Sequence, residues 1–235
     1  MRRALLIATL ALLVFPAAAG AASVRLAECV PALEPVDRSA TFEARVHPVR
    51  GSERMQVRFT LRVRQDVLPG WRRVAAGEFD GWLTSFPDVR RFSYSRTVRN
   101  LSAPASYRTV VRFRWLDEDG DVVKRSRATS RTCRQHDMRP DLVATEIAQV
   151  AGGYEVALRN SGRTGAGPFE VALVAGALAL EPLAVEGLAA GERRTVSVGG
   201  PACSPGEPLT ATVDSAGAVD ERDEDGNVLA LVCRP

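Results

Sequence analysis

The densest cluster of side chains that could do chemistry is the segment 220–227, where six acidic or amide side chains fall within eight residues. Carboxylate and amide oxygens are the ligands that calcium prefers. Three carboxylates occupy positions one, three and five of a calcium-loop pattern, but position twelve is Val232 where a Glu is required. The candidate calcium ligands are Glu221, Asp223 and Asp225. Two alternatives stay open, an ordinary hairpin turn at Asp225-Gly226 and a solvated run of charge.

A second candidate site is basic and aromatic, and it lies in the first half of the chain. Arginines alternate with apolar residues along two predicted strands, so they are expected to share one outward face. Such a face would attract an anionic cell-wall polymer or polysaccharide, and loop tryptophans near it could stack on sugar rings. The candidate residues are Arg58, Arg62, Arg64, Arg112, Arg114, Trp71 and Trp82. The alternative is a face that only keeps the protein soluble.

Four cysteines fit an oxidising compartment and permit three disulfide pairings. The pairs Cys29–Cys133 and Cys203–Cys233 are predicted because each then brackets one proposed domain. A zinc site is disfavoured, since the sequence has no Cys-x-x-Cys and its two histidines, His47 and His136, lie in unrelated places.

Motifs of known catalytic sites are absent from the sequence. It contains no Gly-x-Ser-x-Gly elbow, zinc-helix motif or phosphate loop. We therefore predict a protein that is not an enzyme and that has no cofactor other than the candidate calcium. A secreted hydrolase using the acidic loops 117–121 and 220–225 is the alternative from another functional class.

The first residues have the layout of a secretory signal peptide. A charged start is followed by an apolar core over 4–15 and small residues over 17–22, with cleavage expected after Ala21 or Ala22. The apolar core is too short to cross a bilayer, which needs about 20 residues. Residues 1–22 are thus predicted to be a signal peptide, and the protein is predicted to be secreted, extracellular or associated with the cell surface.

Residues 23–136 are predicted to form an immunoglobulin-like β-sandwich rich in arginine. The segment 55–64 alternates apolar and polar residues with period two, and 107–116 repeats this pattern. The turn at 117–120 ends in Asp-Gly, a strong hairpin signal. Trp115 follows the apolar alternation and is expected in the core.

Residues 137–235 contain a second series of strands, and here the order of motifs is specific. The motifs are Pro140-Asp141-Leu142-Val143, Arg159-Asn160-Ser161-Gly162, the segment 187–192 and the acidic run. This order resembles the CARDB family, the cell adhesion related domain found in bacteria. The resemblance implies an extracellular β-sandwich and, more generally, adhesion. The chain is therefore predicted to be all-β, with two immunoglobulin-like antiparallel β-sandwich domains in tandem after the signal peptide.

Charge divides the chain in the same way. Residues 23–138 carry 22 basic and 14 acidic side chains, whereas residues 139–235 carry 7 basic and 14 acidic side chains. Lys124 is the only lysine, which indicates coding bias and not nucleic-acid binding. We predict a non-catalytic binding or adhesion protein, not membrane-spanning, whose partner is a cell-wall or extracellular polysaccharide or a surface protein. A structural spacer without a ligand is the alternative, and the sequence leaves the oligomeric state open.

Overall fold

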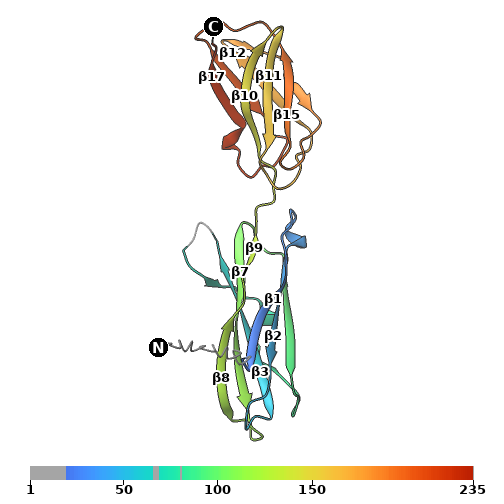
Figure 1. The fold of residues 1–235 in the computed structure, drawn as a ribbon, viewed down its shortest axis with the longest axis vertical. Coiled ribbons are helices and arrows are strands. Elements are labelled where there is room, and N and C mark those ends of the chain that lie inside the picture. Colours follow the sequence, from blue (N-terminus) through green and yellow to red (C-terminus); the bar gives the residue numbers. More distant parts are fainter. Residues whose placement is uncertain (1–19, 66–68, 80, 235) are drawn as a thin grey trace, which may run out of the picture.

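The protein consists of β-strands and three short 3-10 turns in a computed structural model that describes residues 20–65, 69–79 and 81–234 (Figure 1). The predicted signal peptide, residues 1–22, lies outside the described residues except for its last three. No helix in the described ranges is long and apolar enough to cross a membrane.

The N-terminal half contains two antiparallel sheets, ordered β1-β2-β6 and β4-β3-β7-β8, with β5 on β3 and β9 on β7. Apolar residues on the inner faces of both sheets form one core, which includes Phe42, Phe59 and Trp115. Trp115 is fully buried, as predicted, and its indole Nε1 donates to the carbonyl of His47 at 2.7 Å. The elements are β1 (Ala22–Val30), η1 (Pro35–Asp37), β2 (Ser39–Val46), β3 (Arg54–Arg64), β4 (Arg72–Arg73), η2 (Gly77–Phe79), β5 (Leu83–Thr84), β6 (Phe92–Arg99), β7 (Ala105–Leu116), β8 (Val122–Thr129) and β9 (Cys133–Gln135).

The C-terminal half repeats this arrangement with sheets ordered β10-β11-β15 and β13-β12-β16-β17, with β14 on β12. Its separate core includes Tyr154, Leu158 and Leu173. The elements are β10 (Leu142–Val150), β11 (Gly153–Asn160), β12 (Phe169–Ala175), β13 (Leu178–Ala179), β14 (Leu183–Val185), β15 (Arg193–Gly199), β16 (Pro208–Val213), η3 (Asp225–Asn227) and β17 (Val228–Val232).

The prediction of an all-β chain of antiparallel sheets is confirmed. Figure 1 shows the two halves following one another, joined by a short connection after β9. Neither core takes a residue from across the predicted boundary at 136 and 137. The domain limits themselves stay a prediction.

Both predicted disulfides are present, and no described cysteine is free. Cys29–Cys133 joins the end of β1 to β9, so it ties together the first and last strands of the N-terminal half. Cys203–Cys233 joins a loop to the residue after β17. Each bridge closes within one half of the chain.

The two bridges differ in the loop they close, with sequence separations of 104 and 30 residues. In the chain-entropy account, the longer loop contributes about 4.7 kcal/mol and the shorter about 3.6 kcal/mol. We therefore expect Cys29→Ser with Cys133→Ser to destabilise its half by about 1 kcal/mol more than Cys203→Ser with Cys233→Ser. Calorimetric unfolding of the two double variants measures this difference, and a larger loss at the shorter loop would contradict the ordering.

Candidate functional site

One outer sheet face of the N-terminal half gathers eight arginines from three adjacent strands. Strands β3 and β7 pair over eleven positions without a bulge, which places Arg58 opposite Arg112 and Arg62 opposite Arg108. Strand β8 continues the rows by placing Arg127 beside Arg112. This surface, called the arginine face below, consists of Arg58, Arg62, Arg64, Arg108, Arg112, Arg114, Arg125 and Arg127.

Among the residues that the structure describes, these arginines have no acidic partners. Among the described residues, none of the eight takes part in a salt bridge. On the other sheet of the same half, by contrast, Glu43 is held between Arg25 and Arg45 and its pKa is lowered by both arginines. The concentration of positive charge is therefore a property of one face and not of the whole half.

Two tryptophans lie against the arginine face at opposite ends. The guanidinium carbon of Arg108 lies 3.9 Å from the ring centroid of Trp71, and that of Arg64 lies 5.2 Å from it. The guanidinium of Arg114 lies 4.0 Å from the ring of Trp82. Both rings are half-buried. Stacking of this kind is favourable and fixes the plane of each guanidinium.

The centre of the arginine face is partly shielded from water. The Nε atoms of Arg58, Arg62 and Arg108 are buried and have no hydrogen-bond partner among the described residues. Burial, together with the charges of Arg62, Arg64 and Arg127, lowers the pKa of Arg108. Buried donors without partners and like charges on opposed strands both cost stability.

A shallow groove of about 320 Å³ crosses one end of the face. Trp82 forms one wall, and Arg112, Arg114, Arg125 and Arg127 contribute guanidinium groups. Stacked guanidinium groups keep the N–H donors on their edges free, so they can bind the two oxygens of a carboxylate, sulfate or phosphate. The groove thus combines an apolar ring with several anion-binding groups.

The structure places all seven sequence-predicted residues of this site on or against one face. Sequence reasoning missed Arg108, Arg125 and Arg127. Arg108 lies inside the alternating segment 107–116, where period two places it on the same face as Arg112 and Arg114, so the alternation could have found it. In strand β8, Lys124 is next to Arg125, so polar and apolar residues do not alternate along the sequence. Which of these side chains share the face of Arg112 follows only from the pairing of β8 with β7.

The three candidate calcium ligands of the acidic run differ in their exposure to solvent. Glu221 is buried, and its carboxylate accepts the backbone N–H of Leu142 and the side-chain amide of Asn227, the latter at 3.0 Å. Asp223 and Asp225 are exposed. Within the described ranges, no group of three or more His, Cys, Asp or Glu side chains is arranged to hold a metal. Calcium binding by Glu221, Asp223 and Asp225 stays a prediction.

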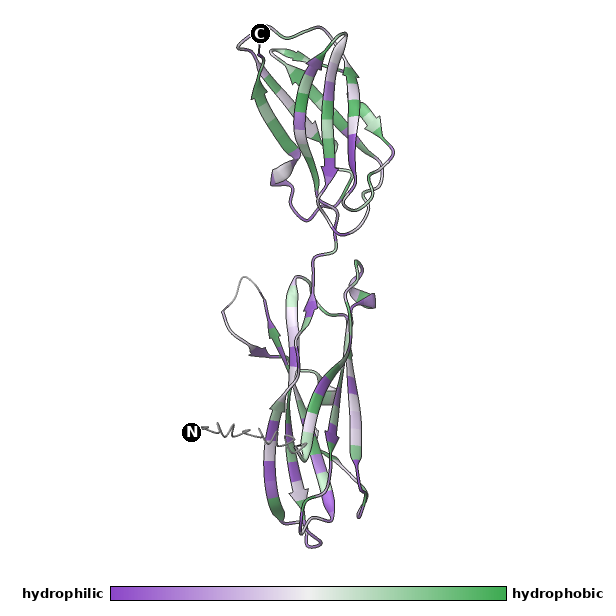
Figure 2. Ribbon diagram, viewed as in Figure 1, coloured by the Kyte–Doolittle hydropathy of each residue, from purple (hydrophilic) through white to green (hydrophobic). Residues whose placement is uncertain are grey.

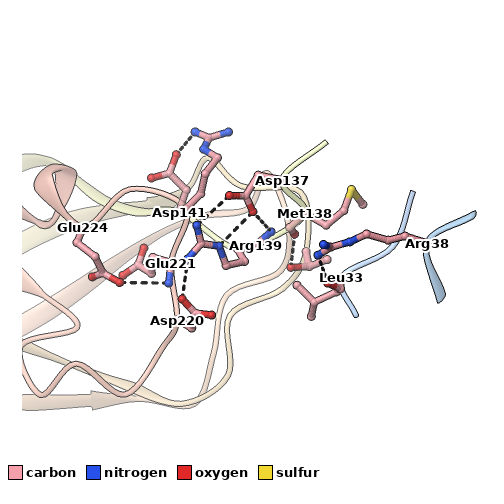
Figure 3. Close-up of polar contacts among 11 residues, drawn as sticks. Leu33, Arg38, Asp137, Met138, Arg139, Asp141, Asp220, Glu221 and Glu224 are labelled. Atoms are coloured by element: carbon pink, nitrogen blue, oxygen red, sulfur yellow. Dashed lines mark hydrogen bonds and ion pairs between the residues drawn. The ribbon is translucent and has the colours of Figure 1, made fainter. Parts of the chain in front are cut away.

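Other residues of the run fasten it to the connection between the halves (Figure 3). Arg139 contacts Asp137 at 2.9 Å and Asp220 at 2.7 Å, which lowers the pKa of Asp137 and raises that of Arg139. Arg222 pairs with the buried Asp141. The run therefore stabilises the start of the C-terminal half, a role that its composition alone did not indicate.

Comparison with known proteins identifies the C-terminal half. Residues 140–231 match the CARDB family, so the chain carries a C-terminal CARDB domain. No curated protein matches the chain.

Several solved structures are similar to parts of the chain. A domain of a protein described as a candidate cell surface protein from Methanosarcina acetivorans is 24% identical, with a TM-score of 0.38, covering 42% of this chain and 94% of that one. The CARDB domain of a Pyrococcus furiosus protein, solved in complex with di-metal ions, is 23% identical, with a TM-score of 0.34, covering 41% and 90%. The class 5 fimbriae chaperone CfaA is 11% identical, with a TM-score of 0.28, covering 91% of this chain and 100% of that one.

The buried carboxylate of Glu221 leads to a pH-dependent stability. Burial raises the pKa of Glu221, an effect that the hydrogen bonds from Leu142 and Asn227 only partly offset. The folded state then binds a proton more tightly than the unfolded state, so this group favours folding more as pH falls from the raised pKa towards about 4.3, the ordinary value for Glu. Relative to Glu221→Gln, the unmodified chain should gain stability on acidification through that window. Urea unfolding of both proteins at a series of pH values measures the gain, and a difference that does not change with pH would refute it.

The arginine face should also respond to salt. Like charges directly opposite one another on paired strands are destabilising, and salt screens their repulsion. Added sodium chloride is therefore expected to raise the unfolding temperature of the N-terminal half. Arg112→Gln, at the centre of a row of three arginines, should raise that temperature at low salt and reduce its dependence on salt. Arg99→Gln, an exposed position on β6, is the matched control, and an equal effect of both substitutions would contradict the explanation.

Proposed function

We propose that this protein, whose residues 140–231 form a CARDB domain, is an exported, non-catalytic protein that binds an anionic polysaccharide at or near the cell surface through its arginine face. The single observation that supports this most is the set of eight arginines on one sheet face with no salt bridge to any described residue. A protein that used them only for solubility would gain the same benefit from charges of both signs.

The shape of the face fits a chain-like ligand. Arg108 and Arg114 are six residues apart on β7, which at 3.3–3.4 Å per residue corresponds to about 20 Å. Trp71 lies at one end of this path and Trp82 at the other. Aromatic rings offer apolar surfaces to sugar rings, and the guanidinium groups between them offer paired donors to acidic substituents. A polymer carrying carboxylate, sulfate or phosphate at intervals would contact both kinds of group.

The CARDB domain has a separate role in this proposal. Residues 139–235 carry 7 basic and 14 acidic side chains. The CARDB domain is therefore net negative and would not compete with the arginine face for an anionic ligand. Arg139, through its ion pairs with Asp137 and Asp220, fastens the end of the connecting segment to the C-terminal half. The domain thus acts as a support or as a contact to a surface protein.

The spacer and hydrolase alternatives rest on weaker grounds. A spacer does not need eight like charges on one face. A hydrolase needs carboxylates that converge on a substrate, whereas Asp117 accepts the backbone N–H of Asp121 at 2.7 Å within a hairpin turn and Glu221 is engaged with Leu142.

Binding to a polyuronate of bacterial origin, with neutral dextran as the comparison ligand, tests the proposal. The chain from residue 23 onward should bind the polyuronate and not dextran, and binding should weaken as salt is added. Arg112→Glu should weaken it about tenfold or more, because a hydrogen bond to a charged group contributes about 1.5–3 kcal/mol. Trp82→Ala should weaken binding by less than Arg112→Glu does, and this loss should be present at every salt concentration. Isothermal titration calorimetry measures each affinity.

The matched control is Arg99→Glu, which makes the same change of charge on an exposed position of the other sheet. If Arg99→Glu weakens binding as much as Arg112→Glu, net charge and not the arginine face governs the interaction. Equal binding of dextran and polyuronate would reject an anionic ligand.

A further inference from the structure

Strand β17 forms one edge of its sheet, and this edge lacks the features that protect the others. Among the described strands it pairs only with β16, and this pairing has no bulge. Its sequence, Val-Leu-Ala-Leu-Val, has no charge, proline or glycine. Val228 is 56% exposed and Val232 is 62% exposed, and Figure 2 shows hydrophobic colouring along most of this strand. Such an edge is a template for pairing with another strand.

The other long edge strands of the described ranges are guarded by charge, and three of them also by an irregular pairing. Charged side chains occur on β1, β6, β8, β10 and β15, and the pairings of β1, β8 and β10 contain irregularities. These are the usual means of preventing edge-to-edge association. Within this molecule, therefore, β17 is the exception among edges of comparable length, and general apolarity of the chain does not explain it.

Strand β17 is also fixed in position at both of its ends. Before it, the buried Asn227 donates to Glu221 at 3.0 Å, and after it Cys233 is bonded to Cys203. A groove of about 790 Å³ runs beside the strand, lined by Ile147 and Gln149 of β10 and by Leu231 and Val232. The inward side chains of an added strand would enter this groove. A strand fixed in advance loses little entropy when a partner binds.

The charges that flank β17 select the partner. Asp223, Glu224 and Asp225 precede the strand and Arg234 follows it, and all four are exposed. In an antiparallel pair of two copies centred on Ala230, Val228 of one copy lies opposite Val232 of the other. Arg234 then lies opposite Gly226, next to Asp225. A parallel arrangement would instead bring the acidic segments of both copies together.

We propose that the free edge of β17 is a self-association surface, through which two copies of this chain pair antiparallel about a two-fold axis at Ala230. The two β16–β17 sheets become one continuous sheet across the dimer. Both copies use the same patch, as a closed two-fold dimer requires. The assembly presents two N-terminal halves, one from each copy.

Sedimentation equilibrium of the oxidised chain from residue 23 onward is the first test. The unmodified protein should show a monomer–dimer equilibrium as its concentration rises. Val228→Lys with Val232→Lys should shift it to monomer, because lysine on an edge strand opposes pairing. The control Val174→Lys changes another exposed valine, 39% exposed, on the interior strand β12 of the same sheet and should leave the dimer intact. Far-ultraviolet circular dichroism of the variants establishes that they fold.

Register and direction are tested separately. Opposed residues in an antiparallel pair have Cα atoms about 4.5–5.5 Å apart, within the range that a disulfide spans. Ala230→Cys should therefore cross-link the dimer through one new disulfide under mild oxidation, and Val174→Cys should not. Arg234→Glu and Asp225→Arg should each weaken the dimer, and the two substitutions together should restore it.

Three results would overturn the proposal. They are a chain that remains monomeric at every concentration, a dimer that the two lysines on β17 leave intact, and an Ala230→Cys protein that cross-links no more than Val174→Cys. A monomer that instead captures an extended apolar peptide would show that the edge accepts a different partner.

Discussion

The in-register pairing of β3 with β7 determines most of what the N-terminal half can do. Eleven consecutive pairs without a bulge keep the alternation of both strands in step. Because Met55, Val57 and Phe59 must face the core together with Phe113 and Trp115, the residues between them must face outward together. A slip of one residue would exchange the two faces, placing arginines in the core. Burial of the apolar side chains therefore holds the arginines together on the opposite face against their mutual repulsion.

Several local interactions offset the repulsion among these arginines. Stacking on Trp71 and Trp82 compensates part of the repulsion, since a guanidinium over an indole ring is stabilised by about 0.5–2 kcal/mol depending on how far it is desolvated. The bridge from Cys29 to Cys133 ties β1 to β9 at the edges of the two sheets, which limits the opening that repulsion would otherwise promote. The aromatic residues and the disulfide thus have a structural role whether or not a ligand is bound.

Sequence reasoning recovered the features that depend on local periodicity. The strand at 55–64 and the face of Arg58 and Arg62 follow from period-two alternation, and the cysteine pairs follow from their position around each half. It could not recover features that depend on distant contacts. Glu221 looks like its acidic neighbours in the sequence, but it is buried, and its carboxylate accepts the backbone N–H of Leu142, 79 residues earlier. An unpaired N–H at that position would cost about 1–3 kcal/mol.

The same limit applies to strand edges. The apolar run of β17 is visible in the sequence, yet a run of this kind is equally suited to the centre of a sheet. Only the topology shows that no strand lies beyond it in the described part of the chain. The arginine face and the free edge of β17 therefore differ in origin. The first follows from side-chain alternation and costs stability within the monomer. The second follows from strand order, and it leaves the outer backbone groups and the exposed valines of β17 open to pairing with another strand.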